Sequence, residues 1–393
     1  MERTGVIAAG LDADIRAGLT HSGIPGAVAL LAARGRTVHH AAYGWALTHD
    51  ARGPCAAPLP MRPETLFDVA SLTKVVATTA VAIALYDRGR LDLDSRASRY
   101  LPALRRAGAN GITVRQLLEH RAGLATWYPL FLHTDEPAEA VALACRQPLV
   151  AQPGTRRVYS DLGMLVLGAA LERVAGEPLD ALAARLVFEP LGMTTTGFRP
   201  EAWAGAPAAA TSTGNPVERR LAAELAGAAP ELDTGGAGRW RRHTLVSEAN
   251  DANAALALRG VAGHAGLFST AGDLARFAHA VLAAARARAQ DGPWSPRTVV
   301  RFLQPGRHPE QALGFWLRRA SAARAARPSV DDSFGHRGFT GCELAASPAA
   351  DWVAILLTNR LHTPTGEGVD HTPTWHGLLR RFLGEHAAAA GRA

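Results

Sequence analysis

Residues 64–88 read ETLFDVASLTKVVATTAVAIALYDR, and this stretch decides the fold. The four residues SLTK at 71–74 open an apolar, helix-compatible run that ends near Gly89. A serine in the first turn of a helix lies in the positive end of the helix dipole, beside unpaired backbone N–H groups. A lysine three residues later lies on the same face, one turn away. The spacing therefore predicts that the hydroxyl of Ser71 and the amine of Lys74 are neighbours.

Lys74 is also the only lysine, because 41 of the 42 basic residues are arginine. Arginine does not lose its proton in a protein, whereas a desolvated lysine does. A serine hydroxyl is a poor nucleophile that needs a neighbouring base. We therefore interpret Ser71 as a nucleophile and Lys74 as its proton-handling partner. The alternative is an N-cap serine beside an exposed lysine that survives by chance in an arginine-rich composition.

A second segment, Tyr159-Ser160-Asp161, follows a Pro-Gly-Thr turn and precedes a predicted helix at 162–175. Such a loop can aim a phenol into a cleft. Tyr159 would share the proton with Ser71 and Lys74, since a phenolate is stabilised beside a cation. The alternative is an ordinary turn in which Asp161 caps the next helix.

A third segment, His336-Arg337-Gly338, precedes Phe339 and a predicted strand. Its small residues would let a substrate lie against a strand edge, and either His336 or Arg337 would bind a carboxylate. The N–H groups of Phe339 and Ser71 would form an oxyanion hole. The alternative is a glycine-rich turn that leads into a strand.

Two further residues are secondary candidates for the lining of the cleft. His264 stands between two glycines, Gly263 and Gly266, at the start of a strand, and Trp127 is the other candidate. A turn histidine and a packing tryptophan are the alternatives for these two positions.

Together, in this order, the three segments resemble the SxxK serine hydrolases, the family of class C β-lactamases and D,D-peptidases. The resemblance covers about residues 20–385. It implies a β-lactamase/transpeptidase-like α/β (α+β) fold, in which an antiparallel sheet flanked by helices carries an inserted all-helical domain. It also implies an acyl-enzyme on Ser71, with Lys74 and Tyr159 sharing the general-base work and no cofactor. Further stretches that resemble the family are 64–70, 116–124, 190–193, 263–274 and 356–360.

Two departures from the family pattern argue against β-lactamase activity. His336 replaces the usual lysine of the third motif, as in the esterase and peptidase branches. Asp161 stands where the lactamases and many peptidases carry asparagine. An acid there would repel a substrate carboxylate, or pair with Lys74 and raise its pKa.

Hydrophobic periodicity gives the expected organisation of the chain. Residues 1–62 and 265–393 are predicted to form a sheet domain, and 63–264 a mostly helical domain with a long irregular segment at 200–260. Residues 50–63 are interpreted as a connection. The predicted strands are 26–33, 37–43, 341–346 and 352–358, and the predicted helices are 8–20, 71–88, 113–120, 138–146, 162–175, 178–188, 273–287 and 374–385.

Composition limits the class of protein. The chain has 393 residues, 48% of them hydrophobic and 20% charged, which is typical of a globular enzyme. The net charge of +7 comes from scattered arginines without interleaved aromatic residues, which argues against nucleic acid. We expect no membrane span, no signal peptide and a cytoplasmic location. The three distant cysteines are expected to be buried thiols, and the 15 histidines show no metal-ligand spacing.

These observations predict a hydrolase that acts on a small ester, amide or peptide. A cytosolic acyltransferase that passes the acyl group from Ser71 to an amine or alcohol is the first alternative. A non-catalytic binding or sensor protein is the second. The expected partner is a small-molecule acyl donor, and the oligomeric state is left open.

Overall fold

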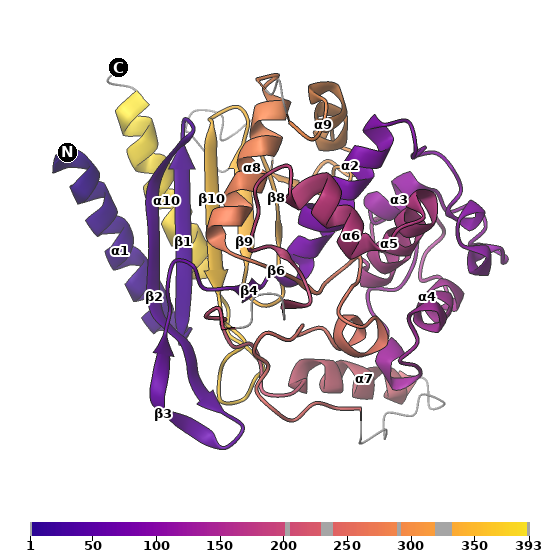
Figure 1. Cartoon of the computed structure of the whole chain (residues 1–393), viewed down its shortest axis with the longest axis horizontal. Helices are drawn as coiled ribbons and strands as arrows, with labels where there is room; N and C mark the ends of the chain where they lie inside the picture. The colour runs from indigo at the N-terminus through magenta and orange to yellow at the C-terminus, as the bar shows by residue number, and fades with distance from the viewer. Residues whose placement is uncertain (1, 201–204, 229–238, 289–291, 319–331, 391–393) are drawn as a thin grey trace.

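A computed structural model describes residues 2–200, 205–228, 239–288, 292–318 and 332–390. Its main feature is a seven-stranded sheet in the order β3-β2-β1-β10-β9-β8-β7, in which every neighbouring pair is antiparallel. Because β1 pairs with β10, both halves of the chain contribute to one sheet (Figure 1). The expected antiparallel sheet is confirmed. The strands are β1 (Gly26–Ala33), β2 (Arg36–Asp50), β3 (Gly53–Pro60), β7 (Trp316–Arg318), β8 (Ser333–Arg337), β9 (Glu343–Ser347) and β10 (Trp352–Thr358).

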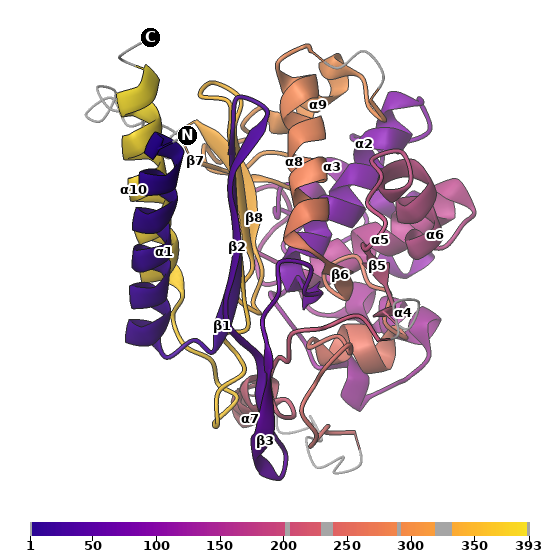
Figure 2. The ribbon, with the colours of Figure 1, turned by 60° about the vertical axis from the view of Figure 1, so that its left-hand side comes forward.

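Helices cover both faces of this sheet. α1 (Glu2–Ser22) and α10 (Thr372–Ala390) lie side by side on one face, and α8 (Ala271–Ala285) lies on the other (Figure 2). Alternate residues of β1 face the two layers, so that Leu31 packs with α1 and α10 while Leu30 belongs to the core on the α8 side. This two-sided burial explains why 26–33 is an uninterrupted apolar run.

The remaining elements lie between β3 and α8 in the sequence or follow α8. A small sheet joins β4 (Phe67–Asp68), β6 (Leu267–Ser269) and β5 (Gly197–Phe198). The other α-helices are α2 (Ala80–Asp87), α3 (Val114–Leu118), α4 (Pro137–Arg146), α5 (Asp161–Ala175), α6 (Leu179–Ala183), α7 (Pro216–Ala228) and α9 (Pro296–Leu303). The division into a sheet domain and a helical domain stays a prediction.

The segment 70–87 is not the single α-helix that the sequence predicts. It begins as a 3₁₀ turn at Ala70–Leu72, widens into a π-helical stretch at Lys74–Thr79 and continues as α2. Such π-helical stretches are frequent at functional sites. Ala70–Asp87 also has the length and hydropathy of a membrane span, but 83% of it is buried inside the protein, as is usual for a core helix.

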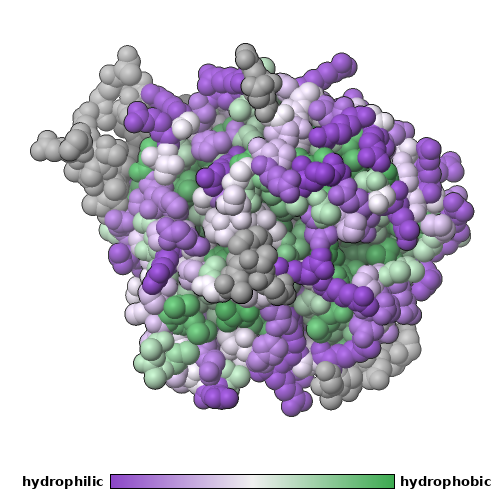
Figure 3. All heavy atoms as spheres, in the orientation of Figure 1, coloured by the Kyte–Doolittle hydropathy of each residue, from purple (hydrophilic) through white to green (hydrophobic). Residues whose placement is uncertain are grey.

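The predicted connection at 50–63 is wrong, because Gly53–Pro60 forms β3 at the edge of the sheet. Its prolines are tolerated there because an edge strand has one side without hydrogen-bond partners. Trp45 and Leu59 of the β2–β3 pair are 45% and 36% exposed, and hydrophobic side chains gather at the lower left of Figure 3, where Figure 1 draws β3. Cys55 on β3 is only partly buried, whereas Cys145 and Cys342 are buried as expected.

The predicted irregular segment at 200–260 is also wrong in part of its described residues, and its residues 201–204 and 229–238 lie outside them. It contains α7, whose Pro216 at the first position and apolar residues at helical spacing favour a helix. A π-helical turn follows at Asn253–Ala257. Both elements lie near the cavity described below, so this segment supplies part of its wall.

Candidate active site

Ser71 stands in a sharp turn between β4 and the buried helical segment. Ala70 before it has a positive φ of 45°, a conformation that costs a residue with a Cβ atom about 1–2 kcal/mol. The carboxyl of Asp68 holds this turn, accepting bonds from the N–H of Ala70 (2.8 Å) and of Asn250 (2.6 Å). Burial raises the pKa of Asp68 to about 6, against the effect of these N–H groups. The strained turn is therefore fixed from two sides.

Lys74 is fully buried, so the alternative of an exposed lysine is wrong. Its Nζ donates to Ser71 Oγ at 2.6 Å and to the carbonyl oxygen of His264 at 3.0 Å. Nζ also lies 2.7 Å from Oδ1 of Asp161, which is the ion pair that the sequence suggested. Burial alone would lower the pKa of Lys74, but the charge of Asp161 and its hydrogen bond with Lys74 outweigh the burial and raise this pKa. The resting amine is therefore an ammonium group that donates to the serine.

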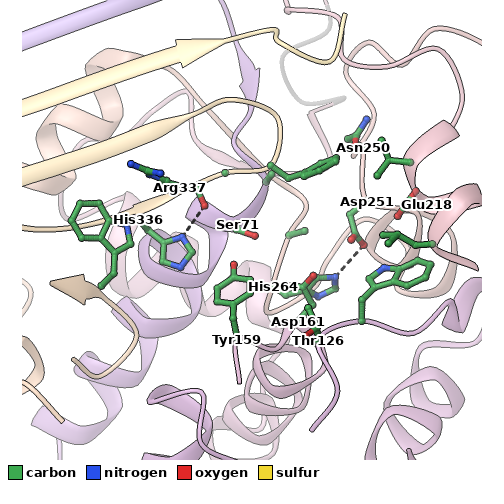
Figure 4. A pocket seen from close by; sticks show the side chains of 18 of the residues that line it. Ser71, Thr126, Tyr159, Asp161, Glu218, Asn250, Asp251, His264, His336 and Arg337 are labelled. Carbon is green, nitrogen blue, oxygen red and sulfur yellow. Dashed lines mark hydrogen bonds and ion pairs between the residues drawn. The ribbon is translucent and has the colours of Figure 1, made fainter. Parts of the chain in front are cut away.

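Tyr159 completes the contact. Its hydroxyl hydrogen-bonds with Lys74 and Ser71, and Figure 4 shows the phenol aimed at the serine. The ring is near the rings of His120 and His336, with centroids 4.6 and 5.9 Å away. Burial raises the pKa of Tyr159, and the neighbouring Lys74 counteracts only part of this rise. At rest the group is a phenol.

Asp161 is the first residue of α5 and is not its cap. Ser160 is the N-cap, and its Oγ accepts from the N–H of Gly163 at 2.9 Å. The alternative in which Asp161 caps the helix is therefore wrong. Because the serine takes that role, the Asp161 carboxylate is free to pair with Lys74.

His336 and Arg337 are the last two residues of β8, so this segment is a strand and not the turn of the alternative interpretation. Their side chains point to opposite faces. Arg337 Nε donates to the fully buried Glu343 at 2.7 Å. His336 Nδ1 lies 2.9 Å from the carbonyl oxygen of Arg337, which requires the proton on Nδ1 and leaves Nε2 as an acceptor.

Burial lowers the pKa of His336 to about 3, with the charge of Lys74 acting in the same direction. The imidazole is therefore neutral. Since Arg337 is already paired, neither side chain is the free cation that the sequence suggested as a carboxylate ligand.

Gly338 brings the end of β8 against the turn that holds the serine. A Cβ atom there would lie 2.4 Å from the carbonyl oxygen of Val69, so only glycine fits. Among the described residues, the N–H groups of Ser71 and Phe339 have no hydrogen-bond partner. Two donors from adjacent segments are thus available to a developing oxyanion.

These groups line one cavity of about 430 Å³, a size typical of small-molecule sites. In Figure 4, His336 and Arg337 lie on one side of Ser71, and Glu218, Asn250 and Asp251 lie on the other. The structure brings together every site residue predicted from the sequence. Lys74 is buried beneath the cavity wall and contacts Ser71. The lining residues from the predicted set are Ser71, Trp127, Tyr159, Asp161, His264, His336, Arg337, Gly338 and Phe339.

Sequence reasoning missed Arg157, Glu218, Asn250 and Asp251, which also line the cavity. The last three come from the segment interpreted as irregular. His264 Nε2 lies 3.0 Å from Asp251 Oδ1, and burial raises the pKa of Glu218 to about 8, with the charge of Asp251 adding to the effect. In the part of the chain that the structure describes, no group of three His, Cys, Asp or Glu side chains is placed to hold a metal ion.

Comparisons with known proteins identify relatives that are similar in sequence or in fold. The chain is 29% identical over 380 residues to the N-acetylmuramyl-L-alanine amidase of Bacillus subtilis (strain 168), covering 91% of this chain and 82% of that protein. The structure matches EstCE1, described as a hydrolase with promiscuous acyltransferase activity, with a TM-score of 0.70, 23% identity and 99% of each chain covered. It matches a class C β-lactamase from Rhodobacter sphaeroides with a TM-score of 0.67 and 18% identity, covering 96% of this chain and all of that one.

The family model described as Beta-lactamase matches residues 11–377. This range includes Ser71, Tyr159 and His336, which the structure places around one cavity. The expected β-lactamase/transpeptidase-like fold is confirmed, and the chain belongs to the beta-lactamase family of serine hydrolases.

Proposed function

We propose that this hydrolase cleaves a small amide, ester or peptide through an acyl-enzyme on Ser71. The observation that carries the proposal is the contact of 2.6 Å between Lys74 Nζ and Ser71 Oγ, made by a lysine without solvent exposure. Tyr159 hydrogen-bonds with the same two groups. A buried, proton-exchanging cluster around one hydroxyl is what activates a serine nucleophile.

Acylation then proceeds from a cluster that has lost one proton. Ser71 Oγ attacks the substrate carbonyl while its proton passes to the Lys74–Tyr159 pair. The new oxyanion accepts hydrogen bonds from the backbone N–H groups of Ser71 and Phe339. As the C–N or C–O bond breaks, the pair returns the proton to the leaving amine or alcohol. Water attacks the ester by the reverse sequence and releases the acid.

The B. subtilis relative suggests one substrate to test, because its name describes cleavage of the amide between a muramyl acyl group and alanine. A cavity of about 430 Å³ is large enough for a compound of that size. N-acetylmuramyl-L-alanine therefore belongs in a panel with 4-nitrophenyl acetate, D-alanine 4-nitroanilide and nitrocefin. We expect ester and amide turnover, and slow nitrocefin turnover because Asp161 replaces the asparagine of the lactamases.

Covalent labelling tests the nucleophile directly. A fluorophosphonate probe should modify Ser71 in the folded wild type, as located by mass spectrometry, and should not modify the Ser71→Ala variant. No adduct on Ser71 in folded protein would refute both the hydrolase and the acyltransferase mechanisms, and would favour the non-catalytic alternative.

Acyl transfer to an amine or alcohol uses the same acyl-enzyme, and it stays a prediction. Trp127, Trp316 and Phe339 give the cavity an apolar wall on which such an acceptor can pack. Added amine should then divert the product from acid to amide. If the acid is the sole product at saturating amine, hydrolysis is the function.

The cytoplasmic location is likewise a proposal, testable by cell fractionation.

A further inference from the structure

Arg157 lies in the cavity wall two residues before Tyr159, and the mechanism above does not use it. Its Nε donates to Oε1 of Gln311 at 2.9 Å. Gln311 is only 2% exposed, and its Nε2 donates to the carbonyl oxygens of Ala312 (2.9 Å) and Phe315 (3.0 Å). A buried amide thus holds the guanidinium from behind and fixes its direction.

The guanidinium of Arg157 has no charged partner in the part of the chain that the structure describes. Among the described residues, no carboxylate lies within ion-pair distance of it, and its two terminal nitrogens make no hydrogen bond. Burial lowers the pKa of Arg157, and the charge of Glu310 opposes this effect only at longer range. Holding a partly buried cation without a partner costs free energy, which an anionic ligand would recover. Arg337, the other arginine of the cavity, already forms an ion pair with Glu343.

Arg157 also belongs to one end of the cavity. Its charge lowers the pKa of both His120 and His336, so it lies on their side of the site. In Figure 4, His336 is on the opposite side of Ser71 from Glu218 and Asp251. An anion at Arg157 would therefore be separated from these acids by the nucleophile.

We propose that Arg157 binds a carboxylate of the substrate, so that the natural substrate is an anionic ester or amide. This inference rests on the proposed hydrolase function. The two terminal nitrogens of a guanidinium match the two oxygens of a carboxylate in a planar, bidentate arrangement. Because the contact with Gln311 occupies Nε, the two terminal nitrogens of Arg157 are left to bind the substrate.

Two matched pairs of esters test the proposal. Phenyl acetate and 4-acetoxybenzoate differ by a carboxylate on the leaving group. 4-Nitrophenyl acetate and 4-nitrophenyl hemisuccinate differ by a carboxylate on the acyl group. In Arg157→Gln we expect kcat/KM for one carboxylate ester to fall roughly 10- to 100-fold, mainly through KM, with the neutral esters unchanged. The affected pair identifies the side of the scissile bond that carries the anion.

Arg156→Gln is the control, because Arg156 is the exposed neighbour and its terminal nitrogen donates to the carbonyl oxygen of Val150 at 2.8 Å. It should leave all four rates unchanged. An equal loss on neutral and anionic esters in Arg157→Gln would show a structural role and overturn the proposal. Unchanged rates on all four esters would overturn it as well.

A binding measurement separates this inference from the proposed function. In the Ser71→Ala variant, calorimetry with 4-acetamidobenzoate and with its neutral amide needs no catalysis. Preference for the anion that disappears when Arg157→Gln is added would support the inference even if wild type hydrolysed none of the esters. The same affinity for both compounds, with and without Arg157, would refute it while leaving the hydrolase mechanism intact.

Discussion

Replacement of Asp161 by asparagine tests whether the charge of Asp161 controls the protonation of Lys74. The carboxylate Oδ1 lies 2.7 Å from Nζ of Lys74, and the two side chains are 20% and 0% exposed. Asparagine keeps the shape of the side chain and removes its charge. Burial then acts on Lys74 without its main opposing charge, so its pKa falls.

The size of the effect follows from the distance. Two unit charges 2.7 Å apart attract each other by about 6 kcal/mol at an effective dielectric constant of ~20. Desolvation of both groups offsets much of this attraction. If about a quarter remains, the proton affinity of the lysine changes roughly tenfold, since 1.36 kcal/mol corresponds to one pH unit.

The assay is the pH profile of kcat/KM with 4-nitrophenyl acetate between about pH 7 and 11, because the raised pKa of Lys74 places the loss of its proton at alkaline pH. Attack by Ser71 requires the cluster to lose a proton, so the rate of the wild type should rise with pH. In Asp161→Asn the neutral amine exists at lower pH, and the midpoint of this rise should move down by about one pH unit. Asp94→Asn is the control, because Asp94 is 67% exposed and pairs with Arg115 outside the cavity.

A variant that keeps activity and the wild-type midpoint would refute the reasoning, because it would show that protonation of Lys74 does not limit the reaction. A midpoint that moves to higher pH would refute it too. If Asp161→Asn no longer turns over the ester, the pH dependence of fluorophosphonate labelling of Ser71 gives the same midpoint without deacylation.

Four further substitutions have defined outcomes. Lys74→Arg should lower kcat on 4-nitrophenyl acetate about 10³-fold, because the guanidinium retains its proton; near-normal turnover would contradict the assigned role. Tyr159→Phe should lower kcat about 10²-fold with little change in KM. Gly338→Ala should reduce both activity and the melting temperature, since its Cβ would lie 2.4 Å from the carbonyl oxygen of Val69. Glu218 has a folded-state pKa of about 8 against 4.5 in the unfolded chain, so its contribution to the free energy of unfolding is complete below pH 4.5 and declines as the pH rises to about 8. Urea unfolding at pH 5 and pH 8.5 should therefore show a smaller pH difference in Glu218→Gln than in the wild type.

Local sequence predicts the elements that are buried on both faces. The strands 26–33 and 352–358 are apolar except for Thr358, because each is covered by helices on two sides. This composition can be recognised from the sequence alone. β3 is different, since its prolines and exposed residues favour a connection, and only pairing with β2 makes it a strand. β7, with three residues, is too short for any periodicity and depends on its pairing with β8.

Some residues of the candidate site can likewise be predicted from local sequence, and others cannot. Ser71 and Lys74 are neighbours through helical spacing, so the sequence alone predicts their contact. The pairing of Lys74 with Asp161 could also be predicted, because Asp161 is an acid at a position where the lactamases carry an amide. Arg157 and Asp251 carry no local pattern, because their place in the cavity depends on contacts between segments far apart in the chain. A cavity lining of this kind becomes visible only when the fold is known.

The isolation of Lys74 among arginines has a consequence outside catalysis. An endoprotease specific for lysine has one peptide bond to cleave, that between Lys74 and Val75, and both residues are fully buried. The protease should therefore not cut folded molecules. The rate of the single cleavage should follow the fraction of molecules in which the helix that carries Ser71 and Lys74 is transiently unfolded. The residue assigned to proton transfer is thus also a built-in reporter of how often this helix unfolds, readable on a gel without a substrate or a label.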